Sequence, residues 1–274
     1  MSSKAPQEGK EYPHIRQTLN TCGLASMGMI FLYHSPEIED FLIRMYKSKY
    51  MYNSRKKAPV ERHNEAIIWS QGYLLLKTAR SRKLGNWVSR LASEYDYMDF
   101  KIGIDLFLDG KVTKRIQAKY PDLSTIIKYF RSGIIRKRFM RYYLDQFKTQ
   151  IELRILALML GFSYKPYPGD VMGNLYFMKG EQGVEEKLSF LEDIFNDEKS
   201  SALLGHGQSH WMVPHAINYG DKNKAPTIAI NDPMGSKPRI PVNRLDNSYI
   251  FYFFEYSPRR CKDNLSFLEN VFHL

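Results

Sequence analysis

A cysteine near the start of the chain and a histidine near its end have the surroundings that acyl transfer requires. Cys22 begins an apolar run, CGLASMGMIFLY, that is long enough for a buried helix, with Thr21 or Asn20 as its N-cap. A thiol in the first turn faces the positive end of the helix dipole, which favours the reactive thiolate. The sequence therefore predicts Cys22 as a nucleophile and His210 as the base that takes its proton.

Two residues beside the thiol complete this half of the predicted site. Gly23 leaves room for a substrate carbonyl to approach the backbone, so we expect the Cys22 N–H to help form an oxyanion hole. Gln17 stands just upstream and is expected to aim its side-chain amide at the same oxygen.

The histidine half of the site depends on two strand-like runs. His210 starts the first, HWMVPHAINYG, after the polar turn His206-Gly207-Gln208-Ser209, and Asp232 ends the next, APTIAIND. If these two strands pair, the Asp232 carboxylate lies beside His210 and fixes its tautomer. Pro233 then ends the strand at the rim of the cleft.

Three neighbouring residues compete for these roles. His206 lies in the turn, where it would line the cleft, and His215 is an odd number of residues from His210, so it points to the other face. Asn231 is as able as Asp232 to orient a histidine, but only one of the two points inward on a strand. An Asp-Pro ahead of a glycine-containing turn favours Asp232.

The remaining sequence divides into a helical and a strand-rich part. Ser35-Pro36-Glu37 starts a helix, and further helical patterns cover residues 65–81, 86–95, 123–147 and 151–161, with a hairpin turn expected at Asp109-Gly110. After residue 163 one amphipathic helix, 184–195, is accompanied by strand-like runs at 201–205, 210–220, 225–232 and 248–257. A helical first half ahead of an antiparallel sheet predicts an α+β fold.

Composition indicates a globular protein in a reducing compartment. The chain has 274 residues, 43% of them hydrophobic, which suffices for a large core without disulfides. A disulfide between Cys22 and Cys261 stays open, although free thiols are the better default, and Cys261 is read as incidental. No apolar run reaches the roughly 18 residues of a membrane span, and no signal-peptide pattern follows the early lysines. We therefore expect a cytoplasmic protein with no membrane partner.

Cofactors and metals are not expected. The seven histidines and two cysteines form neither a CxxC pair nor an HExxH motif. His206 and His210 are four residues apart, but on a turn and a strand they lack the helical geometry that such a ligand pair needs.

The formal net charge of +11 is the feature of the composition that indicates a macromolecular partner. Basic surfaces attract nucleic acid, anionic membranes or acidic proteins. The most basic stretch, RSGIIRKRFMRYY at residues 131–143, fits contact with nucleic acid or with an acidic protein, and it also fits an amphipathic helix whose charges are simply solvated. Nucleic acid is not favoured as a partner.

The order of Gln17, Cys22-Gly23, His210-Trp211 and Asp232-Pro233 resembles the papain-like cysteine peptidases. It is most similar to the C39-like group, which includes the leader-peptide-cleaving domains of bacteriocin exporters and the actin-maturation protease. The resemblance implies Gln17 for the oxyanion hole, Cys22 as nucleophile, His210 as general base and acid, and Asp232 as the orienting residue. It does not cover the helical middle of the chain. Cys22 and His210 are 188 positions apart, against roughly 130–150 in papain-like enzymes.

The resemblance also implies an architecture. We expect a single papain-like catalytic domain over residues 1–274, in which the Cys22 helix packs against an antiparallel sheet. The longer Cys-to-His spacing then corresponds to a helical insertion or subdomain over residues 35–160.

The leading functional prediction is a cysteine peptidase that cleaves a peptide or protein through a Cys22 thioester. A transglutaminase-like or other acyltransferase uses the same site but needs an amine acceptor where a peptidase uses water. A third alternative is a non-catalytic basic binding module for nucleic acid or an acidic protein, which an unreactive Cys22 would favour.

Overall fold

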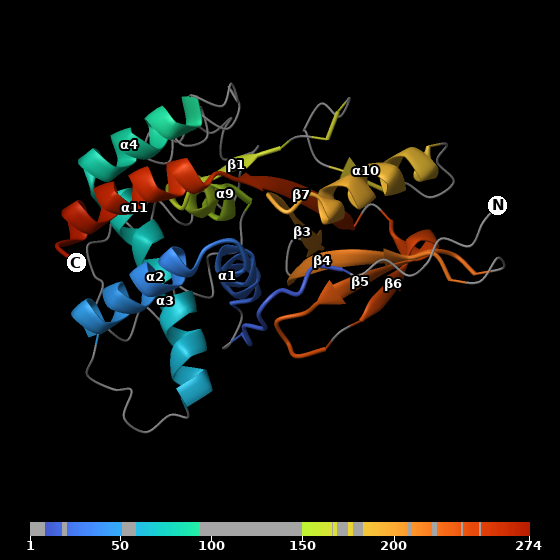
Figure 1. Cartoon of the computed structure of the whole chain (residues 1–274), viewed down its shortest axis with the longest axis horizontal. Coiled ribbons are helices and arrows are strands. Elements are labelled where there is room, and N and C mark those ends of the chain that lie inside the picture. Colours follow the sequence, from blue (N-terminus) through green and yellow to red (C-terminus); the bar gives the residue numbers. More distant parts are fainter. Residues whose placement is uncertain are drawn as a thin grey trace.

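Helices alternate with strands in the way that the two halves of the sequence indicate. The structure is a computed structural model, and it describes residues 9–17, 21–50, 59–93, 150–165, 167–168, 175–177, 183–207, 210–220, 224–236, 238–246 and 248–274. Within these ranges seven α-helices and an antiparallel sheet of seven strands form an α+β fold (Figure 1).

The helices of the described ranges include all but one of those expected from the sequence. They are α1 (Cys22–His34), α2 (Pro36–Tyr50), α3 (Pro59–Arg80), α4 (Arg82–Ser93), α9 (Gln150–Met159), α10 (Val184–Asn196) and α11 (Pro258–Phe272). The helix expected at 123–147, the hairpin turn at Asp109-Gly110 and the basic stretch 131–143 lie outside the described residues.

A Ser-Pro pair starts two of these helices. Ser35 precedes Pro36 at the start of α2, and its hydroxyl oxygen accepts the Ile38 backbone N–H at 3.4 Å. Ser257 precedes Pro258 at the start of α11, and its hydroxyl accepts the Arg260 N–H at the same distance. Proline in the first turn lacks only an N–H that has no partner within the helix. The second pair is as clear as the first, but α11 was not among the predicted helices.

The strands form one open sheet. They are β1 (Phe162–Tyr164), β2 (Leu175–Tyr176), β3 (Ser200–His206), β4 (His210–Asn218), β5 (Thr227–Asn231), β6 (Arg239–Pro241) and β7 (Tyr249–Tyr256), and a 3₁₀ turn (Val242–Arg244) follows β6. Their order is β1-β7-β3-β4-β5-β6, and β2 also pairs with β7. The last strand of the chain therefore lies between strands that precede it in the sequence.

Strand alternation gives the sheet a separate hydrophobic core on each face. On β4, Trp211 and Val213 belong to the core that includes α1, whereas Met212 belongs to the core that includes α10. Helices α2, α3, α4, α9 and α11 join the α1 side, and α10 covers the opposite face (Figure 1). Helix α1 thus runs directly against the strand that begins with His210.

The register brings several strand ends together at one end of the sheet. His206 pairs with His210 across β3 and β4, and it pairs with Tyr249 across β3 and β7. Val213 pairs with Asn231, so β5 ends beside the first residues of β4. This pairing of β4 with β5 confirms the prediction that Asp232 follows a strand next to that of His210.

An extended strap, residues 9–17, runs along the sheet before α1 begins. The Tyr12 hydroxyl and the Ser201 hydroxyl are 2.8 Å apart. Ile15 is buried against α1, where a Cβ added to Gly28 would lie 2.9 Å from its Cδ1. The strap ends at Gln17, whose backbone N–H donates to the Pro233 carbonyl at 2.9 Å.

Candidate active site

Cys22 is the first residue of α1. Thr21, one of the two N-cap residues expected from the sequence, is the N-cap, but its side chain makes no capping hydrogen bond. The thiol therefore lies where backbone N–H groups of the first turn point outward, and the helix dipole favours an anion there. Cys22 is only 3% exposed and forms no disulfide.

The surroundings of Gly23 differ from the open space for a substrate carbonyl that the sequence predicts. A Cβ at this position would lie 3.2 Å from Cδ1 of Trp211 and 3.4 Å from Cδ2 of Leu153. Its missing side chain therefore allows α1 to approach β4 and α9 closely. The prediction that Gly23 leaves space for a substrate carbonyl gains no support from these contacts.

His210 contacts both Cys22 and Asp232. Its Nε2 lies 3.1 Å from Oδ1 of Asp232, and the His210 side chain is 23% exposed. A hydrogen bond with Cys22 is the largest cause that raises the pKa of His210 above its usual value, and the Asp232 carboxylate raises it further against the effect of burial. A raised imidazole pKa favours the imidazolium, which is the form that stabilises a neighbouring thiolate.

Asp232 lies at the first position of a tight turn between β5 and β6. The Gly235 N–H donates to the Asp232 carbonyl at 2.9 Å, and Gly235 has a positive φ of 97° that suits glycine. The carboxylate accepts the Met234 N–H on Oδ1 at 2.8 Å and the Ser236 hydroxyl on Oδ2 at 3.1 Å. The turn chemistry of Asp-Pro-x-Gly thus fixes the carboxylate that faces the histidine.

Helix α1 is also fastened to β4 next to the site. The Ser26 hydroxyl donates to the Trp211 carbonyl at 3.0 Å, and both residues are buried. Ser26 lies one helical turn after Cys22, and Trp211 follows His210 directly. This bond was not predicted, because a serine within an apolar run gives no sign of which carbonyl it will reach.

Gln17 reaches the site through its backbone. Its N–H bond to Pro233 places it beside the turn that begins with Asp232. The His14 ring adds a contact of 3.2 Å between its Nε2 and the Asp232 carbonyl oxygen. Among the described residues, Oε1 of Gln17 is buried and has no hydrogen-bond partner.

The competing residues have other positions. His206 is the last residue of β3 and not part of a turn, and its ring stacks on Tyr249 at 4.4 Å between centroids. His215 lies at an irregularity between Pro214 and Ala216, where the register with β5 shifts. Simple alternation from His210 therefore does not fix its direction.

Asn231 and Cys261 also lie away from the contacts of His210. Asn231 is buried within β5 and pairs with Val213. Cys261 is buried in α11, where its Sγ lies 4.0 Å from the Ser35 hydroxyl, and burial raises the pKa of its thiol. A raised thiol pKa disfavours the nucleophilic thiolate.

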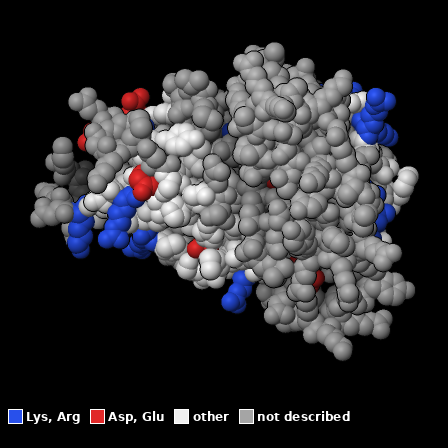
Figure 2. Space-filling model, turned by 180° about the vertical axis from the view of Figure 1, so that it is seen from behind, with Lys and Arg blue, Asp and Glu red and all other residues white. Residues whose placement is uncertain are grey.

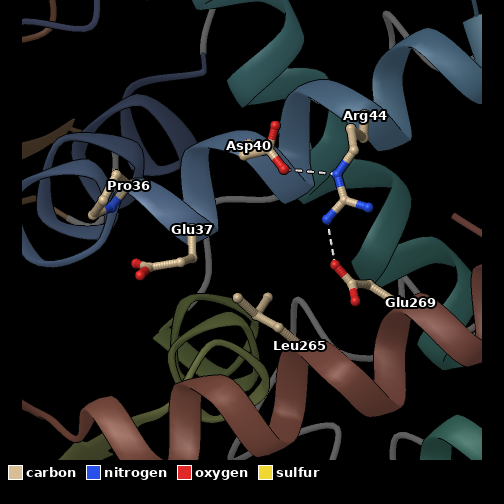
Figure 3. Close-up of a pocket in the computed structure, with 6 residues that line it drawn as sticks. All are labelled: Pro36, Glu37, Asp40, Arg44, Leu265 and Glu269. Carbon is tan, nitrogen blue, oxygen red and sulfur yellow. Dashed lines mark hydrogen bonds and ion pairs between the residues drawn. The ribbon is translucent and has the colours of Figure 1, made fainter.

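A surface pocket of about 330 Å³ lies between α2 and α11 (Figure 3). Arg44 bridges Asp40, at 2.7 Å, and Glu269 across its opening. The pair with Glu269 links α2 to α11, whereas Asp40 and Arg44 both belong to α2. The pocket shares no lining residue with the Cys22 region.

Figure 2 shows Lys and Arg side chains of the described residues at the lower left, at the lower edge and at the right of one face. Across the parts of the chain that the structure describes, no helix has the length and apolar character needed to cross a membrane. Within those parts no three His, Cys, Asp or Glu side chains cluster closely enough to hold a metal ion.

Comparisons with protein-family models, with curated proteins and with solved structures found no match for this chain. The geometry of the site and the resemblance of its motifs are therefore what bears on its activity.

Proposed function

We propose that this chain is a cysteine peptidase of the papain-like kind, similar to the C39-like group, that cleaves a peptide or protein substrate. One observation carries the proposal: His210 contacts the thiol at a helix N-terminus through one hydrogen bond and a buried carboxylate through another. Nucleophile, base and orienting group occur in this relation in thiol acyl-transfer sites.

The proposed reaction begins with a proton shared between sulfur and imidazole. Because Nε2 of His210 faces Asp232, Nδ1 is the ring nitrogen available to Cys22. The thiolate attacks the scissile carbonyl carbon, the C–S bond forms, and the carbonyl π electrons move to oxygen. The Cys22 N–H and the side-chain amide of Gln17 stabilise that oxyanion.

Collapse of the tetrahedral intermediate breaks the C–N bond. The imidazolium of His210 gives its proton to the leaving amine, which departs and leaves a thioester on Cys22. Water, deprotonated by the now neutral His210, attacks the thioester carbonyl. Collapse of this second tetrahedral intermediate breaks the C–S bond and releases the acid product, and the thiolate of Cys22 regains its proton from the imidazolium.

The test is the pH dependence of thiol alkylation by iodoacetamide, followed by intact mass. We compare the full wild-type chain with Cys22→Ala, His210→Ala and Cys261→Ala. The proposal predicts one thiol that reacts well below pH 7, is retained in Cys261→Ala, disappears in Cys22→Ala and slows about tenfold or more in His210→Ala. A Cys22 that reacts only as an ordinary thiol with a pKa of about 8.5, regardless of His210, overturns it.

A further inference from the structure

Ser236 closes the turn that begins with Asp232, and its hydroxyl holds the far side of the carboxylate. It donates to Oδ2 at 3.1 Å, whereas Oδ1 receives the Met234 N–H and contacts Nε2 of His210. The two carboxylate oxygens thus have separate partners. Ser236 is exposed and Asp232 is 7% exposed, so the bond joins a surface hydroxyl to a buried charge.

The covalent geometry of the Asp232 side chain does not fix the orientation of its carboxylate plane. The torsion that rotates a carboxylate plane is broad, so the plane turns readily unless hydrogen bonds hold both oxygens. A rotation moves Oδ1 away from the line to His210 and weakens a charge-assisted bond. Among the described residues, Ser236 is the donor that holds Oδ2.

We propose that Ser236 is a positioning residue for the site: through Oδ2 it fixes the carboxylate plane of Asp232 and so the orientation and protonation of His210. The inference rests on the proposed function for its catalytic meaning. Ser236 bonds to the Asp232 carboxylate and acts on His210 through that carboxylate.

A neighbouring turn supplies a matched control. Ser248 donates to Asp246 through its hydroxyl, and its backbone N–H donates to the same carboxylate at 2.9 Å. Asp246 is exposed, and the hydrogen bonds of its carboxylate go to Ser248. Ser248→Ala therefore also removes a serine hydroxyl from an aspartate carboxylate, two residues away on Oδ1 and not four residues away on Oδ2, in a turn that holds none of the proposed site residues.

The experiment measures two properties of the full chain: the titration of the His210 ring by NMR, and the rate at which iodoacetamide alkylates Cys22 at pH 6. The proteins are wild type, Ser236→Ala, Ser236→Thr and Ser248→Ala, with the fold of each checked by its NMR spectrum. We expect Ser236→Ala to lower the His210 titration midpoint and to slow alkylation about three- to tenfold. Ser236→Thr keeps a hydroxyl at this position, so its His210 titration midpoint and its Cys22 alkylation rate should match those of wild type. Ser248→Ala should also leave these two quantities unchanged.

The outcomes separate this inference from the proposed function. A fast wild-type Cys22 together with a Ser236→Ala variant that behaves like Ser248→Ala overturns the positioning role and leaves the peptidase proposal standing. An ordinary wild-type Cys22 overturns the peptidase proposal, and the His210 titration then still decides whether Ser236 acts through Asp232. A Ser236→Thr variant that resembles Ser236→Ala also counts against the hydroxyl.

Discussion

The backbone N–H of Gln17 donates to the carbonyl of Pro233 at 2.9 Å, which joins the strap before α1 to the turn after β5. Pro233 directly follows Asp232, whose own carbonyl contacts the His14 ring. This hydrogen bond therefore connects Gln17, the proposed oxyanion donor, to the turn that holds the Asp232 carboxylate. A change in the turn is transmitted to both.

Replacement of Gln17 by alanine separates oxyanion stabilisation from thiol activation. Loss of an oxyanion donor costs about 10²–10³ in stabilisation of the tetrahedral state, whereas alkylation by iodoacetamide creates no oxyanion. We expect a tripeptide aldehyde, whose adduct with Cys22 carries that oxygen, to bind about a hundredfold more weakly to Gln17→Ala. The alkylation rate should stay within about twofold of wild type. Equal aldehyde binding by both proteins would remove Gln17 from the oxyanion hole.

Asp232→Asn tests the pair that the carboxylate forms with His210. The hydrogen bonds to Cys22 and Asp232 raise the pKa of His210, so the stability they add is present below pH 6.5 and declines as pH rises through the raised pKa. The variant should lose about 1 kcal/mol in the free energy of unfolding at pH 6 relative to wild type. This difference should shrink above neutral pH in urea titrations. A deficit that does not change with pH would instead indicate lost turn structure alone, and Asp246→Asn provides the comparison for an exposed turn carboxylate.

His34→Gln should reduce acid sensitivity. The His34 ring bonds the Ser201 hydroxyl at 2.8 Å, and burial lowers the pKa of this histidine to about 3. The unfolded chain therefore binds the proton more tightly between pH 6.5 and 3, and wild type loses stability as pH falls through that window. At pH 5 the loss due to this group is about 2 kcal/mol. Glutamine keeps a hydrogen-bond donor but does not titrate. The urea midpoint of the variant should therefore fall less than that of wild type when the pH is lowered from 7 to 5. His63→Gln, on the surface of α3, is the control.

Lys10→Met should weaken the attachment of the strap to α10. The Lys10 amine donates to the carbonyls of Ile194 at 3.1 Å and Asp197 at 2.6 Å, at the end of this helix, and to that of Ser200, the first residue of β3. Removing it leaves buried carbonyls without a donor, which costs about 2 kcal/mol in the free energy of unfolding at pH 7. Lys49→Met is the control, because the Lys49 amine donates to a single carbonyl, that of Phe272. It should cost less than about 1 kcal/mol.

The free energy of unfolding of Lys10→Met should also depend on pH differently from that of wild type. Burial lowers the pKa of Lys10 to about 8 from 10.5, so the unfolded chain holds the proton more tightly between these values. Wild type therefore gains stability relative to Lys10→Met as pH rises from 8 toward 10.5. A difference that is constant across this range would contradict the assignment.

Gly161→Ala should be among the most damaging single changes in this chain. Gly161 has a φ of 89°, and a Cβ there would lie 2.5 Å from backbone atoms of Cys261. Gly183 has a φ of 102° but no atom within 4 Å of the same point. Gly183→Ala therefore measures the cost of the left-handed backbone, about 1–2 kcal/mol. Gly161→Ala should exceed it by about 2 kcal/mol in urea unfolding, because the backbone of α11 must move.

Local signals in the sequence were enough for much of the architecture. The apolar run after Thr21 is α1, Ser35-Pro36 starts α2, and the alternating runs around His210 and before Asp232 are β4 and β5. These elements are determined by short-range chemistry, namely helix starts, strand periodicity and turn residues. They also placed His210 beside Asp232, since adjacent runs joined by a short connection commonly pair.

What the sequence did not provide depends on contacts between distant segments. Pairing of β7 with β3, and not with the strand before it, cannot be read from either run alone. The register shift between Pro214 and Ala216 means that simple alternation along β4 does not fix the direction of His215. The hydrogen bonds of Ser26 and Ser236 depend on where the fold places Trp211 and Asp232, so neither serine stands out in the sequence.

The long-range bonds of the strap have a consequence for how the protein is made. Lys10 bonds to Asp197, 187 positions later, and His14 bonds to a residue 218 positions later. On a ribosome the strap and α1 emerge well before β4, the turn at Asp232 and β7, so their first contacts are with other surfaces or with chaperones. The proposed nucleophile therefore meets its base only when the last quarter of the chain has emerged. Until that point the Cys22 thiol lacks both the histidine and the carboxylate on which its proposed activation depends.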